Sequence, residues 1–501
     1  MATLAEIVAA GNETPGQLRW PRAVVSPEVW GFAGEQLAET TWTLVAHWAE
    51  PFMAHVAVRE RGSGTTGILS VKAPNGKFPS LGRQCLPARR LERAIHDLVG
   101  LEPDGAPDLR PWLDHGKWGM RYPLGVREPP SEMAPYQFLP VEGESLHQIP
   151  VGPVHAGIIE PGHFRFTASG ETIVRLEARL GYTHKGIEGL LIGAPLERAA
   201  KLAGRVSGDS TVAYATAFAQ AIEAASGITA PPQAAHLRAI MLELERIANH
   251  IGDIGAICND VAFTLIHTHC AILRERVLRT SELVFGHRLM MDCVVPGGVA
   301  RDIEQEGKNQ LAKLLVQINK HLPPLAALYE DTASLQDRTV RAGMVLHGLA
   351  AQFGAGGFVG RASGRFFDAR KALPYPPYDT LDFEVPVLER GDVDARIRIR
   401  IREIEQSVSL LRQLISQLPG GDVRLEIAPC GGEGGALVEG FRGDVFAWVR
   451  TNEDGSLARC HLRDPSWFQW PLLEAAIEGN IVADFPLCNK SFNCSYAGHD
   501  L

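Results

Sequence analysis

Long apolar runs and an excess of positive charge are both missing from this 501-residue sequence. No stretch of about 18 uninterrupted apolar residues occurs, so the chain is not expected to cross a bilayer by itself. Its start, MATLAEIVAAGNETPGQ, has neither a cationic region nor an adequate apolar run, which argues against a signal peptide and for a cytoplasmic protein. The net charge of −9 argues against nucleic-acid binding, because neutralising phosphates requires clustered Lys and Arg.

Cysteines are few and widely spaced. None of the eight belongs to a Cys-x-x-Cys pair, and disulfides are not expected in a cytoplasmic chain of this size. An iron–sulfur cluster held by this chain alone is not expected either, because such clusters usually need four thiolates at close spacing. The cysteines are Cys85, Cys258, Cys270, Cys293, Cys430, Cys460, Cys488 and Cys494.

Residues 1–130 predict a small α+β domain. Short runs of alternating apolar residues across 41–71, separated by Pro or Gly, are typical of antiparallel strands. Residues 86–100 carry apolar side chains at helical spacing and end in Gly100, which predicts a helix. The stretch that follows is rich in Pro, Gly and Asp, so we place a linker at 131–150.

Residues 151–501 predict a mainly helical domain with small sheets. A strand pair is expected through 163–180, and strand-like segments return across 421–470. Between them, several segments place their apolar residues on one helical face. The predicted fold class of the whole chain is therefore α+β. The helical segments are 233–251, 262–285, 303–320 and 396–418.

The first domain resembles a known family. FPSLGRQCLPARRLERAIHDLVGL (78–101) is similar to the signature of the small soluble 30 kDa subunit of respiratory complex I. In that signature a Pro-Ser pair precedes a helix that carries Glu, Arg and Asp-Leu. DLRPWLDHGKWGMRYPL (108–124) is similar to the C-terminal end of the same family.

The second domain resembles the large subunit of energy-converting membrane-bound hydrogenases of the formate-hydrogenlyase type (group 4). That family is homologous to the quinone-site (49 kDa) subunit of complex I. Fusion of both modules in one chain is the formate-hydrogenlyase arrangement, which favours that branch. Six motifs carry the resemblance in the family's order: GPVHAGIIEPGHFRF (152–166), LGYTHKGIEGLL (180–191), PGGVARD (296–302), GDVDARIRIR (391–400), EGFRGDV (439–445) and RDPSWF (463–468).

The cysteines that hold nickel and iron in that family are absent. The resemblance implies one ligand pair at Ser207 and Ser210, and a second pair at Ser495 and Gly498. Soft thiolates suit nickel and iron because they donate charge to the metals and bridge them. We therefore expect no metal bound by this chain.

Two other groups could suggest a metal site. Cys488 and Cys494 lie close to the second ligand pair, but their spacing differs from the family's, and reduced, buried thiols are the favoured interpretation. The His-Thr-His-Cys run at 267–270 falls in a helical pattern, where neighbouring side chains point in different directions. Core packing and helix surface explain it better than metal binding.

Glu188 and Asp260 are the main candidates for proton transfer. Glu188 matches the family's glutamate that passes protons beside the metal site, and partial burial would raise its pKa. The alternative is a surface salt bridge with Lys185. Asp260 matches an aspartate at the quinone site of complex I. We expect Glu188 and Asp260 on opposite sides of one internal cavity.

Three histidines and one arginine complete the candidate site. The resemblance places His155, His163 and His184 around the same cavity wall, where a histidine could donate a hydrogen bond to a quinone oxygen. Arg205 could hold Asp209 or a carboxylate of a partner. The alternating arginines of the 396–418 helix are expected on a solvated face that could meet a partner: Arg396, Arg398, Arg400 and Arg402.

The resemblance implies a subunit of a membrane-associated, complex I-like redox complex without a nickel–iron site. Its partners would be a small subunit that holds an iron–sulfur cluster and antiporter-like membrane subunits, with this chain peripheral on the cytoplasmic side of the inner membrane. A quinone is a candidate electron acceptor. The alternative is a catalytically silent scaffold of such a complex, and an active nickel–iron hydrogenase is not expected.

Overall fold

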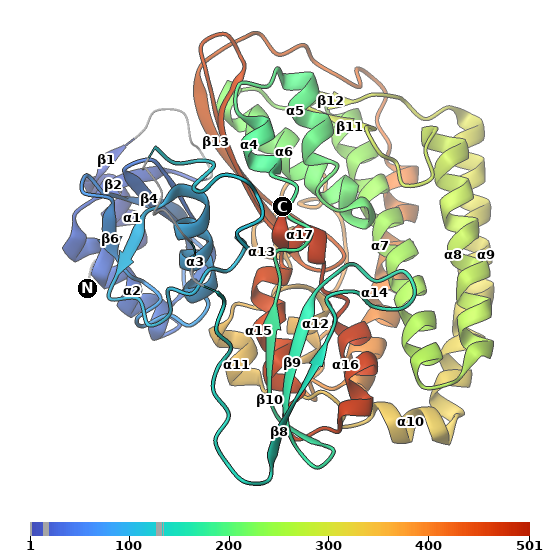
Figure 1. Cartoon of the computed structure of the whole chain (residues 1–501). Coiled ribbons are helices and arrows are strands. Elements are labelled where there is room, and N and C mark those ends of the chain that lie inside the picture. The colour runs from blue at the N-terminus through green and yellow to red at the C-terminus, as the bar shows by residue number, and fades with distance from the viewer. Residues whose placement is uncertain (1–2, 14–19, 127–132, 134) are drawn as a thin grey trace.

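A computed structural model describes residues 3–13, 20–126, 133 and 135–501. Figure 1 shows an N-terminal unit lying against a larger, mainly helical unit, with the C-terminus near the junction of the two. Small sheets and long helices together give the α+β fold class that the sequence predicts. In the described ranges, no helix is long and apolar enough to cross a membrane.

The N-terminal unit is built on a five-stranded mixed sheet in the order β1-β2-β5-β4-β3. β5, β4 and β3, at one side of this sheet, are the antiparallel strands predicted over 41–71. The helix predicted over 86–100 is α3, and Gly100 ends it in the left-handed region (φ 78°) that glycine adopts without strain. The elements are α1 (Leu4–Ala10), β1 (Asn12–Glu13), β2 (Arg22–Val25), α2 (Pro27–Ala38), β3 (Trp42–Glu50), β4 (Met53–Glu60), β5 (Thr66–Lys72), β6 (Lys77–Pro79), α3 (Ala88–Val99) and β7 (Glu102–Asp104).

The larger unit begins with a three-stranded sheet in the order β10-β9-β8. Strands β9 and β10 are the pair predicted through 163–180. β8 takes in residues 146–150 of the stretch we assign to the linker, and the division into domains remains a prediction. The first elements are β8 (Leu146–Val151), β9 (His163–Ser169), β10 (Thr172–Arg179), α4 (Ile187–Leu191), α5 (Leu196–Ala203), the 3-10 turn η1 (Gly208–Ser210) and α6 (Thr211–Ser226).

Long helices stand side by side in the middle of the chain (Figure 1). All four segments with helical periodicity are helices. The first of them, α7, extends beyond the predicted segment 233–251 and ends at Asp260. The elements are α7 (Pro232–Asp260), α8 (Thr264–Phe285), β11 (Val294–Val295), β12 (Gly298–Val299), α9 (Gln305–Asp331), α10 (Ala333–Thr339), α11 (His347–Gln352), α12 (Gly357–Ala362), α13 (Ala369–Ala372) and α14 (Val393–Ser416).

A second three-stranded sheet, in the order β13-β14-β15, joins the two units. The strand-like segment at 423–429 is not a strand: it forms a single bridge from Arg424 to Gly298, so that prediction is wrong there. The last elements are β13 (Gly432–Glu439), β14 (Asp444–Thr451), β15 (Leu457–Arg463), α15 (Ser466–Ala476), η2 (Val482–Asp484), α16 (Phe485–Phe492) and α17 (Tyr496–Asp500).

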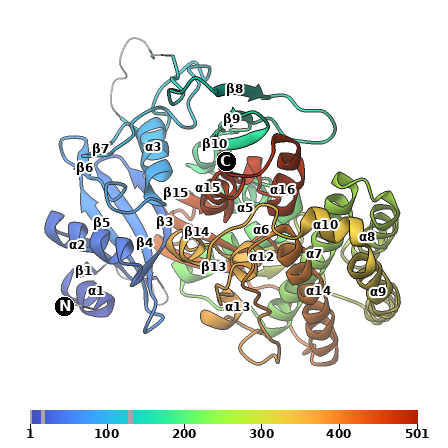
Figure 2. The same cartoon turned by 90° about the horizontal axis from the view of Figure 1, so that it is seen from below.

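Buried aromatic and charged side chains fix the two units against each other. Figure 2 shows β3 of the N-terminal unit beside β14 and β15. Trp48 of β3 packs on Trp448 of β14, with ring centroids 5.4 Å apart. Arg22 of β2 forms a buried ion pair with Glu433 of β13 at 2.7 Å. The interface is therefore a continuous core rather than a flexible junction.

Candidate functional site

A cavity of about 350 Å³ lies where η1, α16 and α17 meet. Segments far apart in sequence form its wall, and three of the four positions that the resemblance assigns to metal ligands lie in or beside η1 and just before α17. The lining residues are Ile158, Ile159, Glu160, Ser207, Gly208, Asp209, Asp260, Arg442, Pro486, Asn489, Lys490, Asn493, Cys494, Ser495 and Tyr496.

Hydroxyl groups occupy three of these four positions, and two of them hydrogen-bond to each other. The Oγ atoms of Ser207 and Ser495 lie 3.1 Å apart. Ser207 donates to Asp209 Oδ1 at 2.7 Å, and Ser495 Oγ accepts from the Gly498 backbone N–H at 2.8 Å. Because the single hydroxyl hydrogen of Ser207 is used in the bond to Asp209, Ser495 is the donor in the bond between the two serines.

A nickel–iron centre does not fit this donor set. Serine hydroxyls stay protonated and bind soft metals weakly, and a glycine offers no side-chain ligand. Cys494 lines the cavity and Cys488 is buried nearby, and both are free thiols. Burial raises the pKa of Cys488 to about 12 and raises that of Cys494 as well, so both thiols are protonated at neutral pH.

An ion pair between Asp209 and Arg442 forms the charged wall of the cavity. Arg442 donates to Asp209 through both terminal nitrogens, at 2.8 and 2.5 Å. Burial opposes ionisation of Asp209, but the Arg442 guanidinium outweighs it and lowers the pKa of that carboxyl to about 2. Arg442 also donates to Ser210 Oγ at 3.0 Å, which ties the ion pair to the serine segment.

Arg205 does not hold Asp209, contrary to one of our expectations. It pairs with Asp292 at 2.7 Å on the surface, where both side chains are well exposed. Arg442 was not predicted as the partner from the sequence, although it lies in the EGFRGDV motif. The available signal was its place in a turn with Gly443 (φ 134°), which packs against the backbone of Gly356 and Gly357.

Asp260 lines this cavity as the last residue of α7. Asp260 is an exposed residue at the rim of the cavity; partial burial of its carboxyl raises the pKa, while Lys490 and His267 oppose that rise. Among the predicted site residues, Asp260 therefore both lines this cavity and has a raised pKa.

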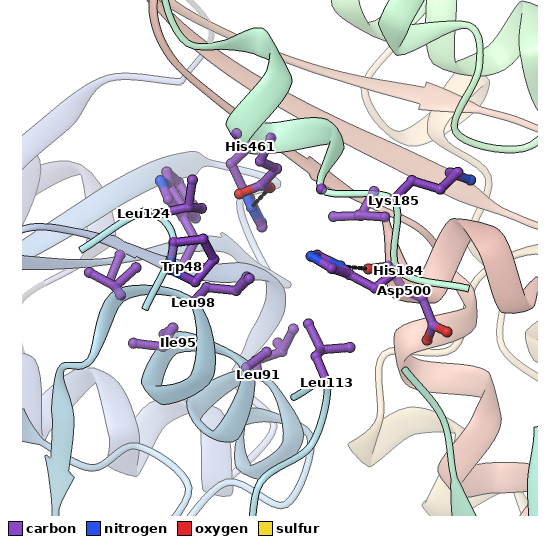
Figure 3. A pocket seen from close by; sticks show the side chains of 18 of the residues that line it. Trp48, Leu91, Ile95, Leu98, Leu113, Leu124, His184, Lys185, His461 and Asp500 are labelled. Atoms are coloured by element: carbon purple, nitrogen blue, oxygen red, sulfur yellow. Dashed lines mark hydrogen bonds and ion pairs between the residues drawn. The ribbon is translucent and has the colours of Figure 1, made fainter. Parts of the chain in front are cut away.

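Glu188 lies at a different cavity, so the expectation of one shared cavity is wrong. It lines a space of about 440 Å³ between the two units, shown in Figure 3. Arg459 and His461 of β15 each approach one oxygen of its carboxylate, both at 2.7 Å. Lys185 instead donates to the Val206 carbonyl, so the predicted salt bridge with Lys185 is wrong as well.

The pKa of Glu188 is lowered, not raised as the sequence suggested. Burial alone would raise it, but the charge of Arg459 and the contact with His461 together outweigh burial and bring the pKa to about 2. Sequence spacing could not indicate this, because both partners come from β15, a strand far along the chain. Glu188 is therefore ionised at neutral pH and is not poised to exchange a proton.

Replacing Glu188 with glutamine is expected to destabilise the protein at pH 7 by about 3 kcal/mol, because Arg459 would lose its buried counter-charge. The folded pKa, about 2, lies below the ordinary value of 4.5. The stabilisation is therefore present above pH 4.5 and is lost as pH falls towards 2. Urea unfolding of the variant and of an exposed control, Glu197→Gln, from pH 7 to pH 3 measures this. A difference from wild type that stays constant with pH would contradict the ion-pair assignment.

The three candidate histidines hold backbone segments and are not among the residues that line the smaller cavity. His155 bonds to the Gly162 carbonyl at 2.7 Å, and His163 to the Gly152 carbonyl at 3.3 Å, so both brace the 152–162 loop. His184 bonds to the Asp500 carbonyl at 2.7 Å and lines the larger cavity. The loop reaches the smaller cavity through Glu160 and its neighbours instead.

Glu245 lies buried beside this site and was not identified from the sequence. Its carboxyl accepts from the backbone N–H groups of Val212 (2.7 Å) and Ala213 (3.2 Å) at the start of α6, next to η1. Burial raises its pKa to about 8, and the nearby charge of Asp209 adds to the rise. Glu245 is therefore a buried carboxyl that can hold a proton at neutral pH.

Two family models match this chain, one in its N-terminal part and one in the larger unit. The family described as "Respiratory-chain NADH dehydrogenase, 30 Kd subunit" matches residues 45–132, and "Respiratory-chain NADH dehydrogenase, 49 Kd subunit" matches residues 260–430. Among solved structures, the membrane-bound sulfane sulfur reductase, an archaeal respiratory membrane complex, has a chain that aligns with a TM-score of 0.68 and 26% identity. The alignment covers 72% of this chain and 100% of that one.

Curated relatives fall into two groups. The carbon monoxide-induced hydrogenase of Rhodospirillum rubrum is 32% identical over 70% of this chain and 98% of its own length. Formate hydrogenlyase subunit 5 of Escherichia coli is 30% identical over 86% of this chain and 78% of its own. An NADH-quinone oxidoreductase subunit of Roseiflexus sp. is 32% identical over 67% of this chain and 94% of its own length. The chain belongs to the large-subunit family shared by membrane-bound hydrogenases and complex I, and the resemblance seen in the sequence is confirmed.

Proposed function

We propose that this chain is the large subunit of a membrane-associated, complex I-like redox complex that works without a nickel–iron site. In this proposal a neighbouring small subunit holds the iron–sulfur cluster that delivers electrons, and antiporter-like membrane subunits complete the assembly. The chain lies peripherally on the cytoplasmic side of the membrane. It couples arrival of electrons to quinone reduction or to movement of protons or other ions.

The observation that carries the proposal is that serine hydroxyls stand where the family has metal-binding cysteines, and that these hydroxyls are already hydrogen-bonded within the chain. Ser207 and Ser495 bond to each other, while the cavity beside them stays open at about 350 Å³. Its wall keeps a fixed ion pair, Asp209 with Arg442. Hydroxyl and guanidinium groups bind oxygen atoms of a polar head group well, whereas they bind soft metals poorly.

Asp260 is the proton-handling residue of the proposal. Its carboxyl lines the cavity and its pKa is raised. A carboxyl in that condition responds to a change of charge nearby, so reduction of a cluster in the adjacent subunit would shift its pKa further. The ion-paired Glu188, in contrast, stays charged and takes no part in this relay.

The composition and turnover of the complex test the proposal. The complex purified through a tag on this chain is expected to contain iron and a small iron–sulfur subunit, to lack stoichiometric nickel, and neither to evolve nor to consume hydrogen. Electron transfer from a reduced low-potential dye to a water-soluble quinone, and the accompanying ion movement in vesicles, are then measured. About one nickel per chain would overturn the proposal.

The same assay with Asp260→Asn separates a coupling role from a silent scaffold. The amide keeps the shape of the carboxyl but cannot exchange a proton, so coupled turnover is expected to fall by about 100-fold, the lower range for a lost proton-transfer group. Asp337→Asn, at an exposed position in α10, is the matched control and should keep wild-type rates. Wild-type rates in both variants, with the complex intact, would favour the scaffold.

A further inference from the structure

The cavity between the two units has one apolar wall and one polar wall. Its volume, about 440 Å³, falls in the range of small-molecule sites. In Figure 3, Leu91, Ile95 and Leu98 of α3 lie on one side, and His184 and Lys185 lie across from them. The apolar wall comes mainly from the N-terminal unit and the polar wall from the larger unit, so neither unit forms the cavity alone.

His461 offers an unused hydrogen-bond acceptor at this cavity. Figure 3 places it at one end of the cavity, and its ring stacks on that of Trp48 with centroids 4.9 Å apart. Its Nδ1 bonds to the ionised Glu188 carboxylate, so Nδ1 carries the proton. Burial lowers the pKa of His461, which keeps the ring neutral and leaves Nε2 as an acceptor. Nε2 is buried and has no hydrogen-bond partner within the part of the chain that the structure describes.

Arg459 offers an unused donor on the same wall. It lies two residues before His461 on β15, so both side chains point to the same face of the strand. Both bind the Glu188 carboxylate, which keeps the two groups close together. The Nε–H of Arg459 is buried and, among the described residues, finds no acceptor. Each such group costs free energy until a partner satisfies it.

We propose that this cavity binds an apolar small molecule with one hydroxyl group. The apolar part would lie against Trp48 and the leucine and isoleucine side chains of α3. The hydroxyl would donate to His461 Nε2 and accept from Arg459 Nε. A neutral hydroxyl fits better than an acid, because Glu188 already neutralises Arg459 and a second carboxylate would be repelled. This site is separate from the serine-lined cavity, and the inference does not depend on the proposed redox role.

Two probes that differ only in the hydroxyl test the proposal on the full-length protein. 4-Hexylphenol is expected to bind once per chain in isothermal titration calorimetry. 4-Hexylanisole, its methyl ether, cannot donate a hydrogen bond and is expected to bind at least tenfold more weakly. Leu98→Trp, which fills the cavity, should abolish binding of the phenol. Leu283→Trp, at a position on α8 that is 73% exposed, is the matched control and should leave the affinity unchanged.

Three results would overturn the inference. The first is no binding of either probe to the wild-type chain. The second is equal affinity for the phenol and the ether, since the hydroxyl would then not be recognised. The third is binding of the phenol that survives Leu98→Trp, which would place the probe elsewhere. Because the comparison of the two probes uses the wild-type protein, it stands even if the Leu98 variant fails to fold.

Discussion

Replacing Glu245 with glutamine is expected to make the protein more stable than the wild type at pH 9, by about 5 kcal/mol. The folded-state pKa of Glu245 is raised to about 8, above its ordinary value of 4.5. The folded protein therefore holds a proton that the unfolded chain releases, and stability falls as pH rises from about 4.5 to about 8. Glutamine removes the charge and keeps one acceptor oxygen, which can retain the shorter bond from the Val212 N–H (2.7 Å) while the longer bond from the Ala213 N–H (3.2 Å) is lost.

The measurement is the free energy of unfolding in urea at pH 5, 7 and 9. At pH 5 the variant and the wild type should agree within about 1 kcal/mol, because the wild-type carboxyl is then protonated in the folded state. Glu282→Gln, at an exposed position on α8, is the control and should show no pH-dependent difference. A variant that is less stable than the wild type at pH 9 would show that Glu245 is stabilised as a carboxylate.

Replacing Arg361 with methionine is expected to cost about 5 kcal/mol of stability or more, and to lower the yield of folded protein. Arg361 is fully buried on α12 and donates to Glu403 at 2.7 Å and to Glu439 at 2.9 Å. Methionine fills similar space but leaves these carboxylates without their shared cation, and an uncompensated buried charge is strongly destabilising. Urea unfolding at pH 7 measures the loss.

Two further variants make the result specific. Arg279→Met removes a surface pair with Glu275, where Arg279 is 74% exposed, and should cost less than about 0.5 kcal/mol. Adding Glu439→Gln to Arg361→Met should restore part of the stability, because it removes one unpaired carboxylate. No recovery in the double variant would mean that the loss comes from packing rather than charge.

This buried network also supports the candidate functional site. Arg246 of α7 donates to the carbonyl oxygens of Glu439 and Gly440, both at 2.9 Å. These carbonyls begin the turn that carries Arg442, the partner of Asp209. Loss of Arg361 is therefore expected to disturb the charged wall of the cavity as well as the core.

The sequence by itself determined the fold class and the family. Helical periodicity survives in a single sequence because it depends on local spacing, and it correctly predicted α7, α8, α9 and α14. The end of α3 at Gly100 follows equally from local chemistry. Motif order was enough to identify both modules, since each motif is a short, contiguous segment.

Only the tertiary structure decided which charges pair and which side chains are buried. Arg396 and Arg400 are fully buried, although their alternation with isoleucine suggested a solvated face. The reason is that α14 is enclosed by α7, α12 and α16, so Arg400 meets Asp253 and Arg396 meets Ser491. The sign of the pKa shift at Glu188 likewise depends on β15, a segment that lies close only after folding. Such partners cannot be read from spacing, because electrostatic energies depend on distances between segments that the sequence leaves undefined.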